Sequence, residues 1–142
     1  MAKIKATFKE YRFVILSFFL AGLLFVLLLA KTGIFPFGPA TLLMSDMNSI
    51  YSDFLAEYQR VLHGEGSPLY SFHAGIGLNF LGIIVFYLPS PLNLLLALFP
   101  EKNLLDGITL ITTLKIALSA LTFSFFLKKH NRTTANSLLL TA

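Results

Sequence analysis

Two long apolar blocks, one towards each end of the chain, dominate its hydrophobic pattern. Residues 13–30 contain no charged side chain, and residues 108–127 contain only Lys115. At a rise of about 1.5 Å per residue, a helix of either length approaches the roughly 30 Å hydrocarbon thickness of a bilayer. The pattern therefore predicts two transmembrane helices, at residues 13–30 and 108–127.

Residues 47–62 have a different period, which is that of an amphipathic helix. Apolar residues recur every three or four positions, and the opposite, polar face includes Gln59 and Arg60. Asp46 stands at the N-cap position, and Gly64 follows where a C-terminal glycine is common. We expect a helix that lies along the membrane surface or packs beneath other extracytoplasmic structure.

A third apolar stretch, residues 76–99, is interrupted by Pro89-Ser90-Pro91. Proline removes a backbone donor and pushes the preceding residue out of the helical region, so each half is too short to span a membrane alone. The stretch predicts a broken helical segment, interfacial or re-entrant. The Pro- and Gly-rich residues 33–41, which follow the first apolar block, predict an extended exit loop.

Basic residues flank both apolar blocks and determine the predicted topology. The N-terminal cluster has Glu10 as its single acidic residue, and a second cluster occupies positions 128–132. The positive-inside rule places both clusters in the cytoplasm if the broken segment does not cross the membrane. The first block is longer than the roughly 7–15 apolar residues of a signal peptide and lacks a small-x-small cleavage site, which favours an uncleaved anchor.

The predicted fold is an all-α membrane protein, multi-pass in the cell membrane with its N-terminus in the cytoplasm. Two full transmembrane helices flank an outer loop that contains an amphipathic helix and a Pro-broken interfacial or re-entrant helical segment. In order, these are a cytoplasmic basic N-terminus (1–12), transmembrane helix 1 (13–30), an extracytoplasmic loop (31–107) with helix 47–62 and broken segment 76–99, transmembrane helix 2 (108–127), and a cytoplasmic basic loop with the start of a possible third span (128–142).

Composition agrees with a membrane protein and excludes several classes of site. The chain is 56% hydrophobic and 13% charged, with a mean hydropathy of +0.75, whereas a soluble chain carries about 25% charged residues. The net charge of +4 is small and clustered beside apolar runs, which argues against nucleic acid as a partner. The absence of cysteine excludes thiolate catalysis, and the scattered histidines predict no metal site. No cofactor can be assigned.

Three features are candidates for functional chemistry. Asp46 is either a helix N-cap or a general base near the outer membrane face. Lys115, deep in an apolar helix, is either a snorkelling residue or a ligand for an anionic group. The proline break, with Tyr87, Ser90 and Asn93 as candidate substrate-binding residues, is either an interfacial turn or a site where exposed helix ends attract an anion.

Several motifs, in their order along the chain, resemble the bacterial YfhO membrane protein family. The likeness extends from the first apolar block to Lys129. At one position the chain departs from the family, because Ile50-Tyr51 stands where members often have Gln-Tyr. The matching motifs are Ser45-Asp46-Met47, Ser67-Pro68-Leu69-Tyr70-Ser71, Gly75-Ile76-Gly77-Leu78-Asn79-Phe80, Tyr87-Leu88-Pro89-Ser90-Pro91-Leu92-Asn93-Leu94-Leu95 and Leu114-Lys115-Ile116-Ala117-Leu118.

The resemblance implies a GT-C-like membrane glycosyltransferase that takes a sugar from a polyprenyl-phosphate carrier and modifies envelope polymers such as teichoic acids. In that class an acidic residue of the first outer loop serves as catalytic base, and Asp46 matches it. Its partners would be the bilayer, a lipid-linked sugar donor and an envelope polymer acceptor. Family members are several times longer, so the chain is expected to be an N-terminal portion that is inactive by itself.

Two other classes of function are compatible with the same residues. In a transporter or flippase subunit, Lys115 and the broken segment would line a translocation path. In a non-enzymatic membrane scaffold, the amphipathic helix would bind a partner. Sequence beyond residue 142 would discriminate them, since a soluble C-terminal domain after many spans favours a transferase and inverted repeats favour transport.

Overall fold

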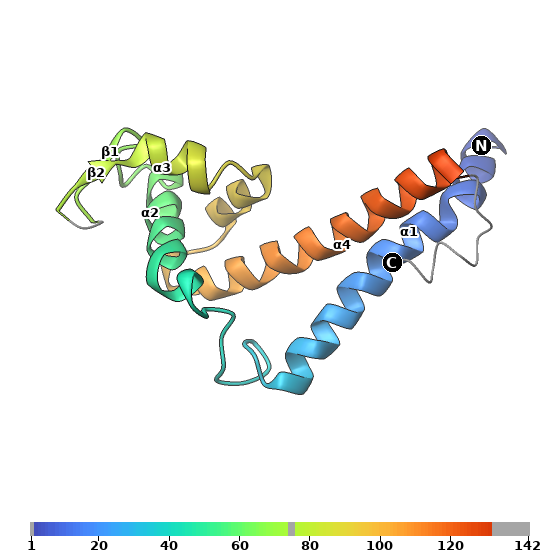
Figure 1. The fold of residues 1–142 in the computed structure, drawn as a ribbon, viewed down its shortest axis with the longest axis horizontal. Helices are drawn as coiled ribbons and strands as arrows, with labels where there is room; N and C mark the ends of the chain where they lie inside the picture. Colours follow the sequence, from blue (N-terminus) through green and yellow to red (C-terminus); the bar gives the residue numbers. More distant parts are fainter. Residues whose placement is uncertain (1, 74–75, 132–142) are drawn as a thin grey trace. The chain divides into compact units, whose positions relative to one another are not determined.

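The computed structural model describes residues 2–73 and 76–131, which are mostly helical (Figure 1). Four α-helices, three short π- or 3₁₀-helices and a two-stranded hairpin follow one another along this part of the chain. Their bounds are α1 Ala2–Thr32, the π-helical turn η1 Met47–Tyr51, α2 Ser52–Leu62, β1 Tyr70–Ser71, β2 Leu78–Asn79, α3 Phe80–Tyr87, the 3₁₀-helix η2 Pro91–Leu98, the 3₁₀ turn η3 Glu101–Asn103, and α4 Leu104–Asn131.

The chain divides into two compact units, which we name the helical pair and the loop unit. The helical pair contains α1 as far as Lys31 and α4 from Thr112 onward. The loop unit comprises Thr32–Ile111.

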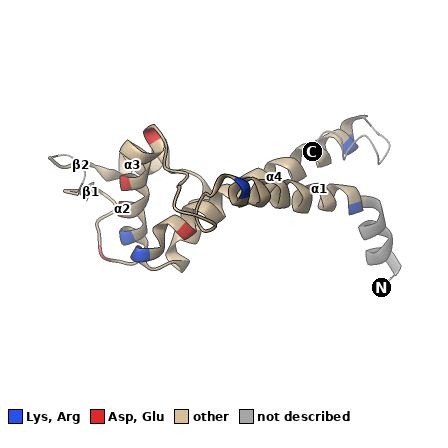
Figure 2. Ribbon diagram, turned by 90° about the horizontal axis from the view of Figure 1, so that it is seen from below, with Lys and Arg blue, Asp and Glu red and all other residues tan. Residues whose placement is uncertain are grey.

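The helical pair contains the two predicted membrane helices. Helices long and apolar enough to cross a bilayer occur at Tyr11–Thr32 and Glu101–His130, which confirms an all-α membrane protein with two candidate spans. Both helices extend beyond the apolar blocks at residues 13–30 and 108–127, because the polar flanks continue the helical backbone. Charged residues are sparse along the apolar blocks of the two helices, where residues 13–30 contain none and residues 108–127 contain Lys115 (Figure 2).

Small residues bring α1 and α4 into close contact. The Ser17 hydroxyl donates to the Val14 carbonyl at 2.8 Å and lies 3.4 Å from the Ala120 carbonyl on the other helix. A Cβ added at Gly22 would lie 3.5 Å from the Cβ of Ala117. Lipid tails are as apolar as the side chains of the helices, so no hydrophobic effect drives helices together in a membrane. They associate instead through close packing of this kind, which small residues allow.

The two helices pair in antiparallel fashion with their basic ends together. Lys128 Nζ lies 3.4 Å from the centre of the Tyr11 ring, and Tyr11 stacks on Phe125 with ring centroids 5.9 Å apart. Tyr11 belongs to the start of the first candidate span and Lys128 to the end of the second. The polypeptide that links the two helices therefore leaves α1 and enters α4 at the other end of the pair.

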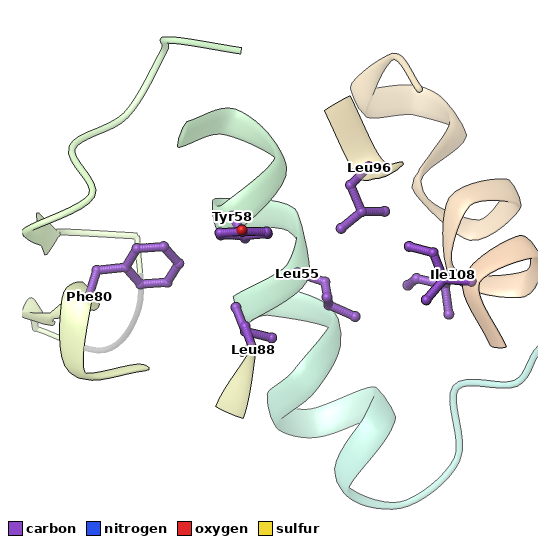
Figure 3. Close-up of a cluster of buried hydrophobic side chains, with 7 residues drawn as sticks. Leu55, Tyr58, Phe80, Leu88, Leu96 and Ile108 are labelled. Carbon is purple, nitrogen blue, oxygen red and sulfur yellow. The ribbon is translucent and has the colours of Figure 1, made fainter. Parts of the chain in front are cut away.

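The loop unit is organised around α2, the amphipathic helix predicted at residues 47–62. One side of α2 packs against α3, η2 and the first turns of α4, and Leu55 and Tyr58 occupy the centre of this contact (Figure 3). The buried core consists of Leu55, Tyr58, Phe80, Leu88, Leu96, Ile108 and Ile111. This core explains why the loop unit is compact although its own helices are short.

The C-terminal end of α2 confirms the predicted role of Gly64. Gly64 adopts a φ of 80°, which glycine tolerates without steric cost. The Glu65 N–H donates to the Arg60 carbonyl at 2.9 Å, and the Gly64 N–H donates to the Val61 carbonyl at 3.0 Å. This pair of hydrogen bonds is a Schellman motif, which satisfies the last carbonyls of the helix.

The broken segment predicted at residues 76–99 is shorter than expected. Its first residues form a strand, because Leu78 pairs with Ser71 and Asn79 with Tyr70 in an antiparallel hairpin. Gly77 makes the hairpin possible, with a φ of 104° and no room for a Cβ beside the Tyr70 ring. The helical part comprises α3 and η2, which are bent by 117° where the sequence has its two prolines.

The exit loop at residues 33–41 is closed on itself and not extended as expected. The Phe35 N–H donates to the Ala40 carbonyl at 2.7 Å, and the Ala40 N–H donates to the Gly33 carbonyl at 3.1 Å. Gly38 allows this closure, since a Cβ there would meet the Gly33 carbonyl. Residues 132–142, which include the predicted start of a possible third span, lie outside the described residues.

Candidate functional site

Asp46 precedes the first turn of the amphipathic helix and its side chain is exposed. It makes no side-chain capping hydrogen bond, and its φ of −59° and ψ of −27° are already helical. The Asn48 N–H is satisfied instead by the Ser45 carbonyl at 3.0 Å. Asp46 therefore occupies the N-cap position without a capping bond from its side chain, and its role as a base stays a prediction.

The residue before Asp46 adopts an uncommon backbone conformation. Ser45 has a φ of 51°, in the left-handed region, which costs an L-residue about 1–2 kcal/mol. Its carbonyl accepts bonds from the Ser49 N–H and the Ser49 hydroxyl, each at 3.2 Å. Backbone strain of this kind clusters at functional sites, because the surrounding structure must stabilise it.

Tyr87 links the broken segment to the first turns of the amphipathic helix. Its ring lies 5.6 Å from that of Tyr51 in a T-shaped contact and 5.5 Å from that of Phe54, measured between ring centroids. The next residue, Leu88, is buried in the core and holds Tyr87 in this position. The structure thus brings predicted site residue Tyr87 to the helix that Asp46 opens, a contact that no sequence pattern indicated.

Ser90 and Asn93 have different places in the proline break. Asn93 is buried, and its side-chain amide donates to the Leu88 carbonyl at 3.3 Å. Its backbone N–H donates to the Ser90 carbonyl at 3.0 Å. The Ser90 side chain is half-buried and makes no capping hydrogen bond to η2. Asn93 therefore holds the turn, while Ser90 and Tyr87 are the accessible members of the predicted set.

Lys115 belongs to the helical pair, whereas Asp46, Tyr87, Ser90 and Asn93 belong to the loop unit. Its side chain is exposed on α4, and its carbonyl accepts a 2.7 Å hydrogen bond from the Ser119 hydroxyl. A buried orientation is not observed within the described pair. Its binding of an anionic group stays a prediction.

Gln59 is a structural residue that sequence analysis placed on the wrong face. Its side chain is 1% exposed, and its amide nitrogen donates to the Phe99 carbonyl at 2.8 Å. The same nitrogen lies 3.3 Å from the Leu96 carbonyl and 3.4 Å from that of Pro100. Gln59 is buried because the end of η2 covers the side of α2 that the period assigned to solvent.

A cluster of charged residues links α2 to the segments that contain His73 and Glu101. The carboxylate of Glu57 is buried and lies 3.3 Å from His73 Nδ1 and 3.7 Å from an Arg60 guanidinium nitrogen. Arg60 also lies 3.7 Å from the Glu101 carboxylate. Glu57 is 4% exposed, and His73 and Arg60 lie beside its buried carboxylate. No group of three or more His, Asp and Glu with metal-binding geometry occurs in the part of the chain that the structure describes.

Replacing Gln59 by leucine is expected to reduce the stability of the loop unit. The change preserves size but leaves buried carbonyls without a donor, which costs about 1–3 kcal/mol. Thermal unfolding of the purified protein, followed by circular dichroism, measures the effect. Asp53→Leu, at an exposed position on the same helix, is the matched control. Equal melting temperatures for Gln59→Leu and the wild type would show that the amide bonds are dispensable.

Comparison with known proteins identifies one family model that matches the chain. The model, described as bacterial membrane protein YfhO, matches residues 17–142. No curated protein and no solved structure matches the chain. The matched range contains both candidate spans in large part and the whole loop unit.

Proposed function

The chain belongs to the bacterial YfhO membrane protein family, and from that premise we propose that it forms the first outer loop and flanking spans of a membrane glycosyltransferase. The donor would be a sugar on a polyprenyl phosphate, and the acceptor would be a hydroxyl of an envelope polymer such as a teichoic acid. The observation that carries this proposal is the state of Asp46, whose carboxylate is exposed and makes no capping bond at the start of a well-packed helix.

In the proposed reaction, Asp46 accepts the proton of the acceptor hydroxyl as its oxygen attacks the anomeric carbon of the sugar. The bond from that carbon to the phosphate oxygen breaks, and polyprenyl phosphate leaves with the electron pair. One base suffices, because a phosphate leaves without protonation, and a single displacement inverts the anomeric configuration. Lys115 is proposed to bind an anionic group, and the accessible Tyr87 and Ser90 are proposed to contact substrate.

The antiparallel helical pair supports a topology in which the loop unit is on one side of the membrane. The basic residues beside Tyr11 and those at Lys128 and Lys129 belong to the same end of the pair. Positive residues favour the cytoplasm, so we place this end inside and the loop unit outside. On that side Asp46 is accessible to envelope polymers.

Single cysteines are expected to distinguish the two sides of the membrane. An impermeant thiol reagent added to intact cells should label Ser67→Cys and Lys102→Cys but not His130→Cys, and all three should react after lysis. Ser67 precedes α3 and η2, and Lys102 follows them, so labelling at both positions shows that these two elements do not cross the membrane. Labelling at His130 alone would reverse the orientation. Labelling at Ser67 without Lys102 would mean that α3 and η2 together form a third span.

The transfer reaction itself is tested with the intact protein, reconstituted in liposomes with a radiolabelled polyprenyl-phosphate sugar. Radioactivity should pass to a purified teichoic acid acceptor only when the protein is present. Movement of the donor between leaflets without transfer would favour a flippase. Absence of both transfer and movement, with several donors and acceptors, would favour a scaffold.

A further inference from the structure

The outward face of α3 and η2 is apolar and uncovered in the loop unit. Phe86 is 76% exposed and Leu98 75% exposed, although both elements bury their other side in the core. We name this face the outer apolar face; its members are Leu81, Val85, Phe86, Leu94 and Leu98. A protein surface of this kind is normally covered by something apolar.

The outer apolar face belongs to a segment without any charge. Residues 80–100 contain no Asp, Glu, Lys or Arg, and α3 and η2 together are apolar enough for a membrane span. They are nevertheless bent by 117°. At about 1.5 Å per residue for an α-helix and 2.0 Å for a 3₁₀-helix, neither eight-residue element reaches across roughly 30 Å of hydrocarbon.

The irregular backbone of this segment is satisfied by protein donors. Asn93 donates to the Leu88 carbonyl at the break, and Gln59 donates to the Phe99 carbonyl at the end of η2. His63 Nε2 lies 3.2 Å from the Ala97 carbonyl and donates to it as the Nε2–H tautomer. In water such carbonyls need no protein partner, whereas non-helical backbone in hydrocarbon is tolerated only when protein satisfies it.

The segment is also continuous with a membrane span. The element η2 ends at Leu98, and the second candidate span begins at Glu101. Leu96 of η2 packs in the same core as Ile108 and Ile111 of α4. Only Phe99 and Pro100 separate η2 from this candidate span, so the segment adjoins in sequence a helix long and apolar enough to cross a bilayer.

We propose that the outer apolar face lies in the acyl chains of the adjacent leaflet, so that α3 and η2 form a wedge that enters the bilayer without crossing it. The partner is the lipid bilayer itself. The α2 helix lies on the other side of the wedge, and Gln59 of α2 and its C-cap residue His63 bond to carbonyls of η2 and of the residues after it. This membrane contact is independent of sugar transfer and holds whether or not Asp46 is a base.

Nitroxide labels test the proposal in the intact protein in liposomes. The 142 residues contain no cysteine, so Phe86→Cys, Leu94→Cys and Leu98→Cys each place one label on the outer apolar face. Phe19→Cys on α1 is the lipid-exposed reference, and Asp53→Cys on α2 is the aqueous reference. Power saturation compares collisions with oxygen, which concentrates in lipid, and with a water-soluble nickel chelate.

The three outer positions should collide preferentially with oxygen, as Phe19 does, and Asp53 should collide preferentially with the chelate. Preference for the chelate at Phe86 and Leu98 would overturn the proposal, because the face would then be in water. Weak collision with both reagents would also overturn it, because another protein segment would then cover the face.

A second reporter guards against perturbation by the label. The 142 residues contain no tryptophan, so Phe86→Trp introduces a single conservative fluorophore. Its emission should be quenched most strongly by lipids brominated near the headgroup end of the acyl chain. Strongest quenching by bromines at the bilayer centre would contradict a shallow wedge, and no quenching by any brominated lipid would contradict lipid contact.

Discussion

Asp46→Asn is expected to lower sugar transfer by about two to four orders of magnitude, the contribution typical of a general base. Asparagine is nearly isosteric with aspartate but cannot accept the proton of the acceptor hydroxyl. Because the Asp46 side chain makes no capping bond, the change should leave the melting temperature of the loop unit unaltered. The rate of transfer from a polyprenyl-phosphate sugar, measured with the intact protein, gives the result.

Asp53→Asn is the matched control for this experiment, since Asp53 is exposed on the same amphipathic helix. It should retain normal turnover. If Asp46→Asn turns over at the wild-type rate, Asp46 is not the base. If Asp53→Asn loses activity and Asp46→Asn does not, the base is Asp53, about two turns further along the helix. Asp46→Ser, a smaller polar replacement, separates loss of chemistry from loss of folding.

Phe80→Ala is expected to destabilise the loop unit by about 3–5 kcal/mol, the range for aromatic truncation in a packed core. Phe80 is completely buried and is the first residue of α3. Its ring packs in the same core as Tyr58 (Figure 3). The cavity left by truncation would loosen the hairpin and α3 together. Chemical unfolding of the purified protein, or protease sensitivity of the loop, measures the loss.

Leu81→Ala provides the comparison, because Leu81 is the neighbouring residue and is exposed in the loop unit. Its effect in detergent solution should be within about 0.5 kcal/mol, as for most surface substitutions. Equal losses for Phe80→Ala and Leu81→Ala would mean that burial at Phe80 does not determine the stability of the loop unit. Phe80→Leu, which refills most of the volume, should recover a large part of it.

The membrane helices and the amphipathic helix were predictable because each has a pattern that extends over many residues. Long apolar blocks, with Lys115 as their single charge, identify α1 and α4, and apolar residues spaced by three and four identify η1 with α2. The hairpin was not predictable, since each strand has two residues and shows no alternation. Its apolar Leu78 instead extended the predicted broken helix upstream.

The candidate site was predictable only in part. Asp46 and the proline break are visible as residues, but the contact of Tyr87 with Tyr51 depends on how α3 folds back on α2. Gln59 was assigned to solvent because the spacing of apolar residues identifies only one buried side of a helix. In the loop unit η2 covers a second side of α2. The hydrogen bond from Gln59 to the Phe99 carbonyl depends on this tertiary contact, so the sequence pattern could not predict it.

The Gln59 contacts also determine when the loop unit can form during biosynthesis. Gln59 precedes the carbonyls of Leu96, Phe99 and Pro100 by 37, 40 and 41 residues. The ribosome therefore releases α2 well before its partners exist, and closing so long a loop must precede any stabilising contact. Until Pro100 is synthesised, the loop unit is incomplete and the Gln59 amide lacks part of its acceptor set. The second span is the next segment to be synthesised, so loop closure and membrane entry of α4 follow within a few residues of each other.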